Sequence, residues 1–166
     1  MSDEYLAQLC SRYLQKGILV DSNILLLWVV GRLNPNRIET FKRTRDFTVE
    51  DFELLNQLLA KFTKVITTPH ILTEVYNLAN QLNSRDREGF LFCLSQLISS
   101  TFNEQQVPAK QLIQNPKFTT FGVTDCGIMK VAAGRFLVLT DDFKLASYLT
   151  AIGIDMLNFN HLRFRT

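Results

Sequence analysis

Several acidic residues stand where an apolar run of the sequence ends or where a helix is expected to begin. The apolar run at 17–20 is followed directly by Asp21, and the run at 136–139 is followed by Thr140, Asp141 and Asp142. Carboxylates that crowd together raise one another's pKa, so a cluster of them either takes up protons or holds a divalent cation. All-oxygen ligand sets suit Mg²⁺ or Mn²⁺, with waters completing the coordination. The acids that could form such a cluster are Asp21, Glu74, Asp125, Asp141 and Asp142.

These acids can meet only if the elements that precede them belong to one sheet. Short runs of continuous apolar or β-branched residues predict buried strands at 17–20, 64–68, 136–139 and 154–159, and a weaker signal predicts an edge strand at 101–107. Helical patterns alternate with these strands, which is typical of an α/β fold with a parallel sheet and right-handed crossovers. Such sheets bind their ligands outside the carboxyl ends of the strands, where the acids are expected.

Periodic apolar residues and capping signals predict the helices between the strands. Thr48 and Asp51 form a capping-box pattern, and Thr124 is the expected N-cap of a later helix. Ser22 and Asn23 can cap the helix that follows the first strand. The expected helices cover residues 3–16, 22–30, 48–62, 69–82, 85–98, 108–114, 123–133 and 143–152.

Length and composition indicate one globular domain, residues 1–166. The chain has 46% hydrophobic and 20% charged residues, and its net charge of +2 is too small to identify a partner. The longest apolar run, Ile24–Val30, is too short to span a bilayer, and the acidic N-terminus does not look like a signal peptide. Cys10, Cys93 and Cys126 are widely spaced and odd in number, which favours reduced thiols. We therefore expect a cytoplasmic protein without a membrane segment.

The segment 31–47 is rich in basic residues and has two interpretations. It contains five Lys and Arg residues against two acids. A charged run of this kind is often a solvated surface excursion. Alternatively, it forms a contact surface for a nucleic-acid backbone, because it follows the helix that leaves Asp21. The backbone contacts would come from Arg37, Lys42, Arg43 and Arg45.

Other catalytic chemistries find little support in the residues. His70 is expected in the first turn of a helix and His161 near the C-terminus, and no Ser/His or Cys/His pair suggests covalent catalysis. A phosphatase with an aspartate nucleophile would need a second Asp two residues after Asp21, where Asn23 stands. No Gly-rich turn follows an expected strand, which disfavours nucleotide binding.

Four motifs, taken in order, resemble those of the PIN-domain nuclease family. They are Val20–Asn23, Pro69–Glu74, Thr124-Asp125 and Val138–Phe143. The resemblance extends from about residue 17 to residue 159, and each motif stands at an expected junction of strand and helix. It implies a three-layer α/β/α sandwich with a mainly parallel central sheet. The helical extension at 1–16 and the basic insert at 31–47 lie outside the pattern of compact PIN toxins.

The resemblance also implies roles for individual residues. Asp21 corresponds to the central metal ligand, Glu74 to the second acid and Asp125 to the third. The fourth acid is Asp142 or Asp141; the spacing of the family motif favours Asp142 and leaves Asp141 as a helper. Ser22, Asn23 and Thr140 resemble residues that position a water or the scissile phosphate, although capping the next helix is an equally good role for Asn23.

The implied activity is that of a metal-dependent endoribonuclease acting on single-stranded or structured RNA. One or two Mg²⁺ or Mn²⁺ ions, held by Asp21, Glu74, Asp125 and Asp142, would activate a water for attack on the phosphodiester. Many bacterial members of the family are toxins of the VapBC type, so the resemblance extends to an antitoxin partner and to a homodimer. The alternative is a PIN-like module that binds RNA or a protein without catalysis.

Overall fold

A computed structural model describes residues 3–164 and has a five-stranded, all-parallel sheet at its centre. The spatial order of the strands is β3-β2-β1-β4-β5, so the first strand of the sequence lies in the middle of the sheet. The strands are β1 (Ile18–Val20), β2 (Val65–Thr67), β3 (Phe102–Glu104), β4 (Leu137–Thr140) and β5 (Met156–Asn158). The prediction of a parallel sheet, with 101–107 supplying an edge strand, is confirmed.

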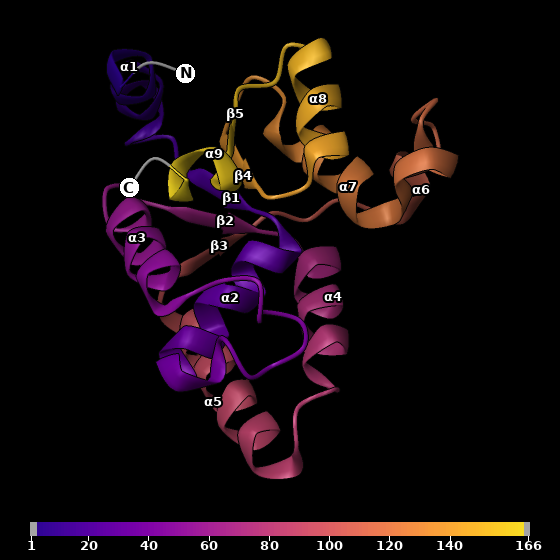
Figure 1. Ribbon diagram of the computed structural model, residues 1–166. Helices are drawn as coiled ribbons and strands as arrows, with labels where there is room; N and C mark the ends of the chain where they lie inside the picture. Colours follow the sequence, from indigo (N-terminus) through magenta and orange to yellow (C-terminus); the bar gives the residue numbers. More distant parts are fainter. Residues whose placement is uncertain (1–2, 165–166) are drawn as a thin grey trace.

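Helices flank this sheet and complete the three-layer α/β/α sandwich that was expected. Helix α2 contacts α3, α4 and α5, while α7 contacts α6 and α8, and Figure 1 shows these two groups on opposite sides of the strands. The helices are α1 (Asp3–Tyr13), α2 (Ser22–Leu33), α3 (Val49–Leu59), α4 (Pro69–Ala79), α5 (Ser84–Ser100), α6 (Ala109–Leu112), α7 (Phe118–Ala132), α8 (Phe143–Ala151) and α9 (Phe159–Arg163), with a short 3-10 helix, η1 (Pro35–Arg37).

Strand β1 fixes the register from which the site is built. Ile18, Leu19 and Val20 have no exposed surface, as expected of a strand covered on both faces. Val20 pairs with Leu139 of β4, and the N–H of Asp21 donates to the carbonyl of Leu139 at 2.9 Å. The last residues of β1 and β4 therefore end side by side at one edge of the sheet.

The basic insert is more firmly packed than a solvated excursion would be. Helix α2 runs three residues beyond its predicted end, and η1 follows it after one residue. Beyond η1, Ile38, Phe41, Thr44 and Phe47 are buried at three-residue intervals, and the Thr44 hydroxyl donates to the carbonyl of Ile38 at 2.7 Å. The insert thus has an apolar inner face, while its cations remain outside.

Two local predictions are wrong. Thr124 does not cap a helix, because α7 already begins at Phe118 and bends at Gly122, whose φ of +77° suits glycine. The expected last strand, 154–159, ends at Asn158, whose side chain caps α9; His161 therefore lies in a helix. No helix within residues 3–164 combines the length and apolar content needed to cross a bilayer.

Two glycines test how tightly α2 packs against its neighbours. A Cβ on Gly31 would lie 2.2 Å from the buried ring of Phe52, whereas a Cβ on Gly89 would meet only a terminal carbon of Leu33, at 2.6 Å, which can rotate away. In the interior of either helix, alanine has a helix propensity about 1 kcal/mol more favourable than that of glycine. We expect G89A to leave the free energy of unfolding unchanged or higher and G31A to lower it by about 1–3 kcal/mol. Urea denaturation measures both, and equal shifts would contradict this packing.

Candidate functional site

A cavity of about 570 Å³ opens at the carboxyl edge of the sheet. Four acids from four different parts of the chain line it: one follows β1, one follows β4, and the others come from α4 and α7. Contact between α4 and α7 closes the space across the edge of the sheet. The lining acids are Asp21, Glu74, Asp125 and Asp142.

Asp21 is the most buried of these acids, with only 6% of its surface exposed. It is the N-cap of α2, so the predicted capping by Ser22 or Asn23 is wrong. One carboxylate oxygen accepts from the backbone N–H of Ser22, and the other accepts from the hydroxyl of Thr140, both at 2.6 Å. These bonds fix the orientation of the carboxylate at the end of β1.

Burial raises the pKa of Asp21 from 3.8 to about 6. The hydrogen bonds from Thr140 and Ser22 oppose this rise, since they stabilise the charged form, while the negative charges of Asp141 and Glu74 add to it. Loss of water around the carboxylate outweighs the two donors. A positive charge brought into the cavity would therefore find a strong partner in Asp21.

Glu74 is held toward Asp21 by a residue that lies between them. The hydroxyl of Ser22 donates to Oε2 of Glu74 at 3.2 Å, while the backbone N–H of Ser22 donates to Oδ1 of Asp21. Helix α4 begins directly after β2 with Pro69 in its first turn and Thr68 as its N-cap. Ser22 therefore connects the acid at the end of β1 with the acid of α4.

Asp125 comes from α7 and has the pKa furthest from its ordinary value among the cavity acids. Burial, together with the negative charges of Asp21, Asp142 and Glu74, raises the pKa of Asp125 from 3.8 to about 7. The positive charge of Lys144 opposes the rise. The Lys144 ammonium lies 5.1 Å from the ring centre of Phe121 and donates to the carbonyl of Thr120 at 3.3 Å, so it stays beside the cavity.

The structure separates the two adjacent aspartates that follow β4. Asp142 lines the cavity and caps α8, since its Oδ1 accepts from the backbone N–H groups of Lys144 and Leu145 at 2.7 and 2.9 Å. Asp141 does not line the cavity. Burial raises the pKa of Asp141. Hydrogen bonds from the backbone and from the Asn23 side chain oppose that rise, as does the positive charge of Arg163.

Thr140 links the acids of β1 and β4. It is fully buried, and its hydroxyl donates to Asp21 while accepting from the backbone N–H of Asp142 at 3.0 Å. Asn23, by contrast, lines the cavity from the first turn of α2 with an exposed side chain. The three polar residues that the sequence singled out, Ser22, Asn23 and Thr140, all lie next to the acids.

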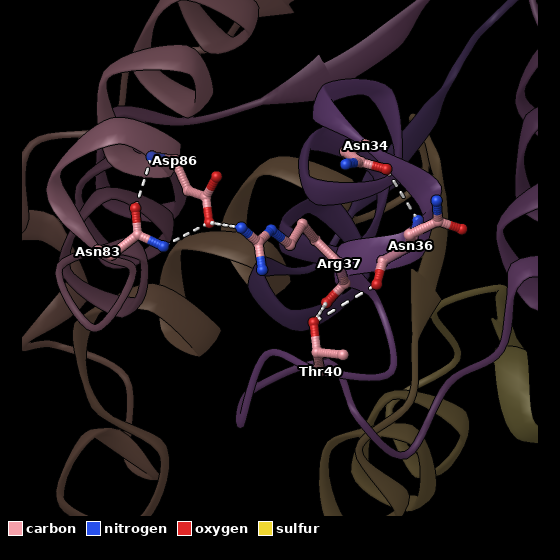
Figure 2. A network of polar contacts seen from close by, with 6 residues as sticks. All are labelled: Asn34, Asn36, Arg37, Thr40, Asn83 and Asp86. Carbon is pink, nitrogen blue, oxygen red and sulfur yellow. Dashed lines mark hydrogen bonds and ion pairs between the residues drawn. The ribbon is translucent and has the colours of Figure 1, made fainter.

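The basic residues of the insert lie outside the cavity lining. Arg37 pairs with Asp86 at 2.9 Å, which attaches η1 to the start of α5 (Figure 2). Arg43 donates to the side chain of Gln81 at 3.2 Å, and Lys42 and Arg45 are exposed.

Several cavity residues were not found from the sequence. Thr73 and Asn77 line the cavity beside Glu74, and Phe121 and Val123 line it from the bent start of α7. His70 also lines it and makes a 3.1 Å hydrogen bond to the carbonyl of Val107. The spacing of His70, Glu74 and Asn77 along one helix was the available signal; the bend at Gly122 gave none.

The donor set of the cavity fits a hard divalent cation in its chemistry, since four carboxylates and neighbouring hydroxyl and amide oxygens surround one space. Within residues 3–164, no three Asp, Glu, His or Cys side chains are arranged so that they alone could hold an ion. Both oxygens of Asp21 and one of Glu74 already accept hydrogen bonds. This arrangement suits Mg²⁺, which keeps several of its waters and takes only one or two protein carboxylates.

Comparison with known proteins assigns the chain to no group: no protein-family model matches it, and no curated protein matches it.

The raised pKa values predict how stability depends on pH. Between about pH 4 and pH 7 the folded protein binds more protons than the unfolded chain, because Asp21 and Asp125 have their pKa values raised to about 6 and about 7. Folding is therefore most favoured at the acidic end of this range, and the free energy of unfolding falls as the pH rises.

D21N removes the contribution of Asp21 and lowers the pKa of Asp125 by removing a neighbouring charge. We expect D21N to flatten this pH dependence and to be more stable than the wild type at pH 8. Thermal unfolding from pH 4.5 to 8, with E53Q as a control for the loss of an exposed negative charge on α3, measures the effect. The same slope in D21N and in the wild type would contradict the assignment.

Proposed function

We propose that this protein is a metal-dependent endoribonuclease whose active site is the acidic cavity. One observation carries the proposal: four carboxylates that are far apart in the sequence line a single cavity at the carboxyl edge of a parallel sheet. Such a concentration of negative charge is tolerable only with protons or with a cation. The resemblance of the four motifs to the PIN-domain nuclease family supplies the reaction, hydrolysis of an RNA phosphodiester.

The roles of the residues follow from their contacts. Asp21 is the fixed ligand, since Ser22 and Thr140 hold its carboxylate in place. Glu74, oriented by the Ser22 hydroxyl, and Asp142, oriented as the cap of α8, complete the negatively charged wall. Asn23 offers an uncharged amide to the substrate from the same wall.

Asp125 is suited to proton transfer. Its pKa of about 7 lies near neutral pH, where a group both accepts and releases a proton readily. We assign to its carboxylate the proton that the attacking water gives up. Lys144, beside it, offsets part of the negative charge that then remains.

Mg²⁺ or Mn²⁺ is the cofactor of this proposal. One or two of the carboxylates of Asp21, Glu74, Asp125 and Asp142 would hold it directly, and the others would contact its bound waters. When bound, such an ion supplies positive charge and Lewis acidity at the scissile phosphate. Asp141 is left out of this set because it does not line the cavity.

The resemblance also proposes a setting for the activity. We place the protein in the cytoplasm, in keeping with three free cysteines, two of them buried. An antitoxin that covers the cavity and a homodimer are proposals that rest on the resemblance alone.

A second candidate is a module that binds RNA or a protein without cleaving anything. The observation that favours it is the lack, within residues 3–164, of three side chains arranged to hold a metal ion by themselves. Isothermal titration calorimetry with Mn²⁺ separates the two candidates. The nuclease should bind Mn²⁺, D21N should lose that binding, and absence of binding by the wild type would leave the binding module as the better proposal.

Two adjacent residues give a sharp test of the active site. D142N and D141N remove neighbouring charges, but only Asp142 lines the cavity, and asparagine caps a helix about as well as aspartate. We expect D21N and D142N to lower the rate of Mn²⁺-dependent cleavage of single-stranded RNA by at least about 100-fold. D141N should retain most of the activity.

A fluorescent oligoribonucleotide assay with Mn²⁺ or with a chelator measures these rates, and circular dichroism confirms that each variant is folded. Full activity of D21N, or equal losses in D141N and D142N, would refute this assignment of the acids.

A further inference from the structure

The cavity continues along one face of α4 into residues that have no role in the proposed chemistry. Thr73, Glu74 and Asn77 line it three, four and seven residues after His70, a spacing that places all four on one side of the helix. Thr73 and Asn77 are exposed and uncharged. Apart from Glu74, this side of the cavity therefore offers uncharged hydrogen-bonding groups.

Gln81 lies just beyond the end of α4. It stands four residues after Asn77 and directly after the C-cap residue Asn80. The Nε–H of Arg43 donates to the Gln81 side-chain oxygen at 3.2 Å. This bond holds Arg43 by one edge of its guanidinium, and its terminal nitrogens make no hydrogen bond or ion pair with any other residue between 3 and 164.

Arg37 of the same insert is in a different situation. Its guanidinium pairs with Asp86, and the side chain of Asn83 donates to the same carboxylate oxygen at 2.6 Å (Figure 2). The positive charge of Arg37 is thus paired with the carboxylate of Asp86, and this ion pair holds η1 against α5. Arg43 keeps an unmatched charge, and exposed Lys42 stands next to it in the chain.

The dimensions of this face suit a short stretch of nucleic-acid backbone. Gln81 stands seven positions after Glu74, and the part of α4 from Glu74 to Ala79 rises about 7.5 Å along the helix axis at 1.5 Å per residue. Nucleotides follow one another at about 3.4 Å per strand in a duplex, so two or three of them cover this distance. A strand that passed the acids would reach Arg43 within a few phosphates.

We propose that the side of α4 that carries Thr73 and Asn77, together with Gln81 just beyond its end, guides the single-stranded RNA away from the cavity, and that Arg43 binds a phosphate that is not cleaved. The inference rests on the proposed function for its choice of ligand. It makes Arg43 a positioning residue and Gln81 the residue that holds it. It also gives a role to part of the basic insert and excludes Arg37 from that role.

The test measures RNA binding in a background that does not cleave. D21N protein is titrated against a short fluorescein-labelled oligouridylate, and fluorescence anisotropy is followed between about 50 and 200 mM salt. Adding R43A should weaken binding by about threefold or more and lower the slope of log affinity against log salt by about 0.7, the value for one lost phosphate contact on a single strand. R43K should retain most of the slope.

The matched control is R12A, because Arg12 also combines an exposed guanidinium with a side-chain partner, Asp155, but lies on α1. In the Asp21-containing enzyme, R43A should raise KM and leave kcat within about twofold, since a remote phosphate contact is made equally in the ground and transition states. R43A that binds and cleaves like R12A would overturn the inference, as would an oligouridylate that D21N protein does not bind.

The outcomes separate this inference from the proposed function. If the wild type cleaves RNA and R43A matches R12A, the path along α4 is wrong and the nuclease stands. If the wild type never cleaves but binding depends on Arg43, the nuclease is wrong and the path stands.

Discussion

Burial of the Asp21 carboxylate is the constraint on which the rest of the site depends. A carboxylate with 6% of its surface exposed must be compensated, and two donors at 2.6 Å do so only in part, since its pKa still rises to about 6. The surroundings add negative charge, because Glu74 and Asp125 share the cavity. The negative charge of the site is therefore not fully compensated by the protein. Protons compensate it at low pH, and a divalent cation would compensate it at neutral pH.

The sheet explains why these acids converge. Strand β1 lies between β2 and β4, so the elements that leave its two neighbours begin beside Asp21. Asp142 follows β4, and the helix that carries Glu74 follows β2. The connections reverse direction between β1 and β4, and such switch points are where open α/β sheets bind ligands. Because β1 and β4 are adjacent, the hydroxyl of Thr140 donates a hydrogen bond to Asp21 and accepts one from the backbone N–H of Asp142.

The sequence predicted what depends on short-range patterns and on the rules for parallel sheets. The apolar run before Asp21 predicted the central strand, and Thr48 and Asp51 do form the capping box. Choosing between Asp141 and Asp142 needed coordinates, because a shift of one residue decides which side chain enters the cavity.

The bend at Gly122 was not predicted either, because it depends on the backbone conformation of a single residue. A positive φ at this glycine joins two helical segments within α7. The helix predicted at 123–133 is the second segment, and its expected N-cap, Thr124, falls inside α7. Pairing of Arg43 with Gln81 joins residues 38 positions apart and leaves no periodic signal at all.

The central claim is that, without a cation, Asp21 holds its proton up to about pH 6, and that a divalent cation displaces this proton. Carbon-13 NMR titration of labelled aspartate carboxyls, with and without saturating Mg²⁺, measures this directly. Without Mg²⁺ the Asp21 carboxyl, identified by its absence from D21N, should titrate near pH 6; with Mg²⁺ its midpoint should fall well below that value. An Asp21 carboxyl that titrates near pH 4, with no response to Mg²⁺, would contradict the account.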